Sequence, residues 1–232
     1  MTARRVLAGL ATLAGLGACT SDVDPAWQLD HDRVIAVRAT PSRIASGESA
    51  VLDALFGHKG APPSELEPDT AEVISPTSLA GALSHGAHWT ITAPGDDQLA
   101  AARSELSLDA GAPVPLRLRV RFAGTPLDGL KVVWLGEHVD NPALDPVTID
   151  NRDALTETQL TVAAGTDIPL AVSFDDSFDI NWLTSCGTMH DFDLARAHLR
   201  VEPADPHSGT LALVVRDDLG GVAWHLWPIT AE

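Results

Sequence analysis

The sequence predicts an all-β protein built from two β-sandwich domains in tandem, with one short helix in the first domain. Short runs of alternating apolar and polar residues recur along the chain, turn-forming residues separate these runs, and a single stretch has helical spacing. The chain has 232 residues, of which 45% are apolar and 20% are charged. It is therefore long enough to bury two cores and too apolar to be disordered.

The clearest strand is the segment 116–122 (LRLRVRF), in which apolar and charged residues alternate without interruption. The apolar side chains are expected to face a core, and the arginines are expected to face outward. A turn over 124–129 and the apolar run 130–135 complete a predicted hairpin.

The first domain is assigned to residues 31–140, with further strands expected at 33–39, 50–56 and 89–93. Residues 57–84 are rich in Pro, Gly and Ser and show little periodicity. We therefore expect a long surface loop there, with at most a short helical turn.

The helix of this domain is expected over 96–106. Asp96 is placed to cap the free backbone N–H groups of its first turn. Leu99, Arg103 and Leu106 recur at helical spacing, so they are expected to share one face.

The second domain is assigned to residues 153–232, after a linker over 141–152 that contains two prolines. The segment 168–174 alternates like a strand, and its partners are expected at 180–184, 195–201, 210–216 and 222–227. The last two strands are separated by a five-residue loop that contains Gly, so they are expected to form a hairpin.

The N-terminus predicts export and lipidation. Residues 1–18 have a short basic start followed by an apolar stretch too short to span a bilayer, which is the pattern of a signal peptide. This segment ends in Leu16-Gly17-Ala18-Cys19, which resembles the lipobox of bacterial lipoproteins and implies that Cys19 carries palmitate-type acyl chains. An ordinary secretory signal that happens to carry a cysteine is the alternative. Residues 19–30 would then form the anchor and tether.

The net charge and the cysteine content limit which partners the protein can bind and which covalent crosslinks it can form. The formal net charge of −17 excludes a protein that grips nucleic acid through phosphate contacts. The same charge repels anionic headgroups, so the expected membrane contact is through acyl chains alone. Thr20 and Ser21 follow Cys19 with no Asp directly after it, and this resembles the sorting pattern of outer-membrane lipoproteins in the cell envelope, on the periplasmic side or at the surface. With Cys19 lipidated, Cys186 has no cysteine left for an intramolecular disulfide.

The segment 32–41 (DRVIAVRATP), with Ala45-Ser46-Gly47-Glu48 before the next strand, resembles the start of immunoglobulin-like bacterial lipoproteins of the myxobacterial type. That resemblance implies an immunoglobulin-like fold and attachment to the cell envelope, and it implies no activity. Trp182 stands where immunoglobulin domains place a core Trp, although the disulfide between the sheets is missing.

The segment 175–193 holds the densest set of chemically capable residues. Cys, His and carboxylate side chains are zinc ligands, and clustered Asp residues in a loop are calcium ligands. The candidate metal ligands are Asp175, Asp179, Cys186, His190 and Asp193. The competing interpretation makes Cys186 a small buried apolar residue and the Asp residues a solvated loop. Catalysis by the Cys186 thiol with His190 as base is disfavoured, because acidic neighbours raise the pKa of a thiol.

A second set of residues is a candidate ligand-binding surface. Arg117, Arg119 and Arg121 form a cationic stripe that could grip an anionic glycan or a partner's carboxylates, unless acidic residues on the neighbouring strands pair with them. Trp224 and Trp227 point to opposite faces of one strand, so at least one of them, with Trp227 preferred, is a candidate for sugar stacking or a protein interface. His85 and His88 are interpreted as a loop pair without function.

The sequence therefore predicts a non-enzymatic, lipid-anchored envelope protein that binds another envelope protein or a polysaccharide. No catalytic residue is assigned, and no cofactor is expected unless 175–193 binds calcium or zinc. Walker, GxSxG and dinucleotide-binding motifs are absent from the sequence. The alternatives are a metal-dependent enzyme or accessory subunit that uses 175–193, and a purely structural spacer.

Overall fold

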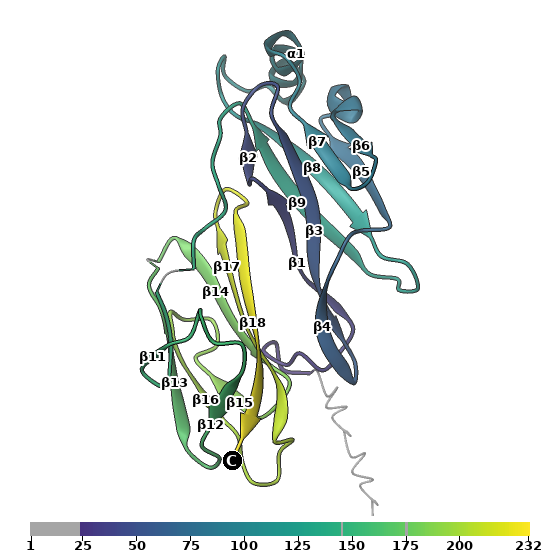
Figure 1. The fold of residues 1–232 in the computed structure, drawn as a ribbon. Helices are drawn as coiled ribbons and strands as arrows, with labels where there is room; N and C mark the ends of the chain where they lie inside the picture. Colours follow the sequence, from purple (N-terminus) through teal and green to yellow (C-terminus); the bar gives the residue numbers. More distant parts are fainter. Residues whose placement is uncertain (1–23, 145, 175) are drawn as a thin grey trace, which may run out of the picture.

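The computed structural model describes residues 24–144, 146–174 and 176–232, and these form two β-sandwiches joined by one short connection (Figure 1). The predicted signal peptide, the predicted lipidation site Cys19 and the candidate ligand Asp175 lie outside the described residues. In the described part of the chain, no helix is both long and apolar enough to cross a membrane.

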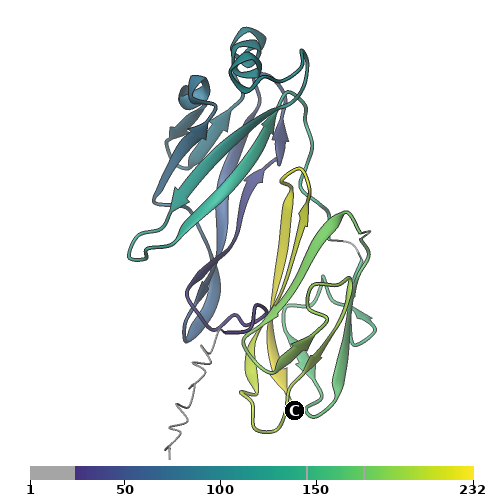
Figure 2. The same cartoon turned by 180° about the vertical axis from the view of Figure 1, so that it is seen from behind.

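The first domain stacks two sheets. One has the order β1 (Arg33–Thr40), β3 (Ser49–His58), β7 (Trp89–Thr92) and β6 (Leu83–His85), with β4 (Ala61–Leu66) extending β3 as a hairpin. The other has the order β2 (Arg43–Ile44), β9 (Asp128–Leu135), β8 (Val114–Arg121) and β5 (Thr70–Ser75). The 3-10 helix η1 (Thr77–Ala82) and α1 (Asp96–Leu106) close the end of this sandwich that lies away from the second domain (Figures 1 and 2).

The second domain repeats the arrangement. One sheet has the order β11 (Arg152–Asp153), β10 (Val147–Ile149), β13 (Asp167–Val172), β16 (Arg196–Arg200) and β15 (Thr188–His190). The other has the order β12 (Leu160–Val162), β18 (Val222–Ala231), β17 (Ser208–Asp217) and β14 (Phe178–Thr184).

Both domains follow the strand order of an immunoglobulin-like sandwich. In each domain the first strand is split between the sheets, and its second part pairs in parallel with the last strand, as β2 does with β9 and β12 with β18. The remaining strands pair antiparallel across Greek-key connections. The predicted fold class, two all-β sandwiches in tandem with one α-helix in the first, is confirmed.

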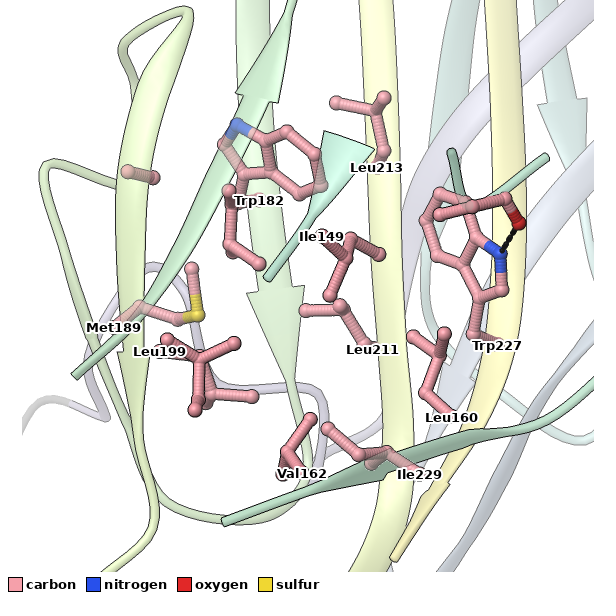
Figure 3. Packing of buried hydrophobic residues seen from close by; sticks show 14 of the residues in the cluster. Ile149, Leu160, Val162, Trp182, Met189, Leu199, Leu211, Leu213, Trp227 and Ile229 are labelled. Atoms are coloured by element: carbon pink, nitrogen blue, oxygen red, sulfur yellow. Dashed lines mark hydrogen bonds between the residues drawn. The ribbon is translucent and has the colours of Figure 1, made fainter. Parts of the chain in front are cut away.

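Each sandwich has its own apolar core. In the second domain, Leu211 and Leu213 on the central strand β17 lie between Trp182 on β14 and Trp227 on β18 (Figure 3). Both indoles are fully buried, and each satisfies its N–H: Trp182 Nε1 donates to the carbonyl of Leu194 at 3.2 Å, and Trp227 Nε1 donates to that of Ala154 at 2.8 Å. Trp182 therefore occupies the core position expected for it, without a disulfide.

Three local predictions need correction. Residues 57–84 are not a long loop, because β4, β5, η1 and β6 fall within them. The linker predicted over 141–152 is shorter, since β10 already pairs with β13 of the second domain. The helix has the predicted bounds, but Gly95 is its N-cap residue, and Asp96 lies in the first turn, where its charge still favours the helix dipole.

Candidate functional site

Four of the five metal-ligand candidates of the segment 175–193 lie among the described residues, and these four do not converge. Among the described residues, no group of three or more His, Cys, Asp or Glu side chains is placed to hold a metal ion. Asp179, His190 and Asp193 are exposed, whereas Cys186 is buried. The described residues therefore give no support to the calcium or zinc site considered for this segment.

Cys186 has the environment of a structural residue. Its backbone carbonyl accepts a hydrogen bond from the Thr184 hydroxyl at 2.7 Å, and the close approach of Gly209 leaves its side chain no free volume on that side. Burial raises the pKa of the Cys186 thiol, which disfavours the thiolate that catalysis or zinc binding needs.

The arginine stripe is largely neutralised by carboxylates on neighbouring strands. Arg119 lies 3.1 Å from Glu72 and 3.7 Å from Asp128, and Arg121 lies 3.6 Å and 3.3 Å from the same two residues. Arg117 is exposed and forms no ion pair with any residue the structure describes. The alternative of pairing across the sheet therefore holds for Arg119 and Arg121.

Trp227 is not an exposed platform, so its prediction as a ligand-binding residue is wrong. Alternation does direct Trp224 and Trp227 to opposite faces of β18, but both faces are covered. Trp227 fills the core of the second domain, whereas Trp224 is covered by the first domain. A strand at a domain junction is buried on two sides, and alternation alone cannot show this.

His85 and His88 approach a single carboxylate. Glu67 lies 3.8 Å from His85 Nε2 and 3.3 Å from His88 Nδ1, and it also accepts the backbone N–H of Trp89 at 2.5 Å. The Glu67 contacts therefore fasten the turn before β7, and His85 belongs to β6 rather than to the loop expected for this pair.

The feature that sequence reasoning missed is the junction between the domains. The β17–β18 hairpin of the second domain runs alongside β1 of the first, and β4 of the first reaches down beside the second (Figures 1 and 2). A separate apolar cluster is buried between them, formed by Leu29, Ala36, Leu55, Leu183, Ala212, Val214, Val222 and Trp224. This cluster fixes the domains as one unit.

Polar contacts complete the junction around Trp224. Its indole N–H donates to Glu65 Oε1 at 2.8 Å, and the guanidinium of Arg38 lies over the ring at 3.7 Å. Arg38 is itself held by Asp53 on the facing strand β3, at 2.5 Å. Asn141 bridges the domains by donating to the carbonyl of Ala39 at 2.8 Å and by accepting the backbone N–H of Val222 at 2.9 Å.

Lys131 is the buried charge of the junction. Although it lies on the inward face of β9, its Nζ reaches the carbonyl of Gly220 in the turn between β17 and β18, and the residue is only 4% exposed. Burial lowers the pKa of Lys131 to about 8, and the carboxylates of Asp217 and Asp53 oppose that shift.

Beside this lysine the domains enclose a cleft of about 580 Å³, the candidate functional site. One wall is β1 and the outer side of β9, and the other is the segment 216–222 of the second domain. Trp134 is half-buried in the cleft, Asp128, Asp217 and Asp218 supply carboxylates, and Leu130 is 71% exposed at its edge. An aromatic ring, an exposed aliphatic side chain and several carboxylates can bind a ligand, but they do not form a nucleophile–base pair.

A sequence signal for the junction was present. Residues 210–215 and 222–227 are almost continuously apolar rather than alternating, and such runs indicate strands buried on both faces. The facing surface gives no comparable signal, because the first domain contributes only isolated apolar side chains to the cluster, namely Leu29, Ala36 and Leu55, with Ile35 partly buried.

Comparisons with known proteins give structural likeness without a family. No family model matches the chain, and no curated protein matches it. Among solved structures, it is similar to a nucleoside hydrolase-related hypothetical protein from Saccharophagus degradans, with 16% identity over 40% of this chain and 26% of that one, at a TM-score of 0.31.

Two further solved structures match most of the chain. A C-terminal 282-residue fragment of intimin, solved with the intimin-binding domain of its translocated receptor, has 11% identity over 86% of this chain and 64% of that one, at a TM-score of 0.30. The tandem Ig repeats of Dlar have 10% identity over 84% and 96%, at a TM-score of 0.28. The chain thus spans less than two thirds of the length of the first two structures. At these TM-scores, the fold assignment rests on the strand order described above.

Proposed function

We propose that this chain is a lipid-anchored cell-envelope protein with a non-enzymatic binding role, and that the cleft at the domain junction recognises a protein partner or a polysaccharide. One observation carries the proposal: the cleft has walls from two domains that a buried apolar cluster holds in a fixed relation. A preformed site loses little entropy when a ligand binds, which favours recognition.

The edge of the cleft supports a binding role over that of a spacer. Leu130 is more exposed than any other large apolar side chain that the structure describes, and the half-buried Trp134 lines the same cleft four residues further along β9. An exposed apolar side chain gains free energy when a partner covers it, and an aromatic ring in a cleft that also holds carboxylates suits the apolar face and the hydroxyl groups of a sugar. A spacer needs neither feature.

Crosslinking from the edge of the cleft tests this proposal. A photoreactive p-benzoylphenylalanine replaces Leu130 in cells that make the protein, and the matched control carries it at Leu194, which is 54% exposed in the second domain. We expect an adduct from position 130 and none from position 194. Mass spectrometry of the adduct then separates a protein partner, seen as peptides, from a polysaccharide, seen as a series of sugar masses.

Equal crosslinking at both positions, or none at position 130, would contradict a recognition role for the cleft, and the second result would favour a spacer. The anchor is tested separately with the Cys19→Ser variant. We expect this variant to lose palmitate labelling and to leave the membrane fraction, because the acyl chains are the proposed anchor.

A further inference from the structure

Two arginines from different domains meet near the start of β1, and one of them, Arg216, also lines the cleft described above. Arg33 begins β1 in the first domain, and Arg216 lies near the end of β17 in the second. Arg33 Nη1 donates to the carbonyl of Ala26 at 2.8 Å. Arg216 donates from Nη1 to Asn181 Oδ1 at 2.7 Å and from Nη2 to the carbonyl of Ile35 at 2.6 Å.

Part of the Arg33 guanidinium has no partner. Its Nε and Nη2 atoms are buried and make no hydrogen bond, although a guanidinium has five N–H donors to satisfy. Among the described residues, no carboxylate lies within ion-pair distance of Arg33 or Arg216. Burial, and then the charge of Arg216, lower the pKa of Arg33, so the two cations repel each other.

Both arginines line one cavity of about 160 Å³ at the junction. Asn181 is its other polar side chain, and apolar walls come from Ala26, Leu183 and Phe192. Apolar walls strengthen electrostatic interactions inside the cavity because they exclude water. Asp179 lies opposite Arg216 on β14 and attracts it, but this carboxylate is exposed and does not line the cavity.

We propose that this cavity binds a phosphate or sulfate group between Arg33 and Arg216. A guanidinium keeps its proton under all ordinary conditions, so the two cations cannot relieve their repulsion by titration. A tetrahedral oxyanion in the cavity places negative charge between the two cations and cancels their repulsion, and guanidinium groups bind such anions well. Because the two arginines belong to different domains, the bound anion also stabilises the junction.

The phosphate or sulfate group in this cavity can belong to a free ion, or the phosphate can belong to a phospholipid headgroup. Ala26, whose carbonyl binds Arg33, lies seven residues after Cys19, so the cavity is close in sequence to the proposed anchor. This second source rests on the proposed lipidation, whereas binding of a free ion does not.

Calorimetric titration of the purified mature chain with sodium phosphate and with sodium sulfate tests the site, using sodium chloride at matched ionic strength as the reference. We expect one oxyanion per chain, and an affinity at least tenfold weaker in Arg33→Gln. The matched control, Arg117→Gln, removes an exposed arginine without an ion pair and should bind like the wild type. Equal binding by Arg33→Gln would overturn the site.

A second measurement compares the wild type with Arg33→Gln, because phosphate and sulfate stabilise any folded protein by exclusion from its surface. Phosphate should raise the unfolding temperature of the wild type more than that of Arg33→Gln, because an anion that binds only the folded state stabilises it. Vesicles of phosphatidylglycerol, offered to the Cys19→Ser variant, separate the two sources. Binding that needs Arg33 and is displaced by phosphate assigns a headgroup, whereas phosphate binding without vesicle binding assigns a free ion. Binding of neither phosphate, sulfate nor vesicles would overturn the proposal.

Discussion

The two domains share one strand order but fill it with different side chains. In the second domain, large indoles on the two strands that flank β17, Trp182 on β14 and Trp227 on β18, span the core with Leu211 and Leu213 between them (Figure 3). The first domain buries no tryptophan in its core. It uses Phe56 and Phe122 with many alanines, and it recruits Leu99 and Ala102 from α1 to close one end.

This difference shows which information specifies the fold. The strand order survives a complete change of core residues, so it follows from alternation and turns rather than from particular side chains. The large indoles of the second domain instead concentrate its stability in a few positions, whereas the small residues of the first spread the buried area over many.

The largest expected effect is therefore at Trp182. We expect Trp182→Ala to cost about 3–5 kcal/mol of unfolding free energy, because it removes a fully buried ring and leaves a cavity between the sheets. The same place in the strand order of the first domain is β5, where Val73 is only half-buried, and Val73→Ala should cost about 1 kcal/mol. Urea unfolding followed by fluorescence measures both, and similar losses would show that the cores do not differ in this way.

The sequence predicts an element well when one face of that element is buried and the other is exposed to solvent. The segment 116–122 alternates because one face is buried and the other is wet, and the helix over 96–106 has turn residues at both ends. By contrast, β5 is half-exposed throughout, and β4 contains two prolines and pairs with only one end of β3. Neither strand has a strong periodic pattern, so the sequence predicts a loop over 57–84.

The candidate site could not be predicted because its parts are far apart in sequence. The cleft joins 34–37, 128–134 and 216–222, and none of these segments carries a motif. Alternation predicts that Trp224 and Trp227 lie on opposite faces of β18, but it does not predict what covers each face. The residues that cover Trp224 are Arg38 and Glu65, and both lie in the other domain.

The next largest effect is expected at Trp224, which tests whether the junction behaves as a third core. Trp224→Ala should cost about 3 kcal/mol, because it removes a buried indole and its contact with Arg38. Without this contact, the single unfolding transition expected of coupled domains should divide into two. Calorimetry measures both effects, with Leu194→Ala as an exposed control. A single transition in Trp224→Ala would show that the rest of the junction is enough to couple the domains.

The effect expected at Lys131 is smaller than those at Trp182 and Trp224, and it depends on pH. The folded chain lowers the pKa of Lys131 to about 8, below the value of 10.5 that an exposed lysine has, so the unfolded chain binds more protons between these limits. The stability contributed by this residue therefore rises as the pH increases from 8 to 10.5. Lys131→Met removes the titrating group while keeping a long side chain directed toward Gly220.

We expect the difference in unfolding free energy between wild type and Lys131→Met to shift by about 2 kcal/mol toward the wild type from pH 7 to pH 10. Urea unfolding of both proteins at the two pH values measures it, and every other titrating group cancels in the difference. Lys59→Met is the matched control, because Lys59 is an exposed lysine of the same domain and should give no such shift. If the Lys131 difference stays constant with pH, the ammonium is solvated and the domains do not close over it. The cleft beside Lys131 would then be an open gap rather than a preformed site, and the case for recognition at the junction would fail with it.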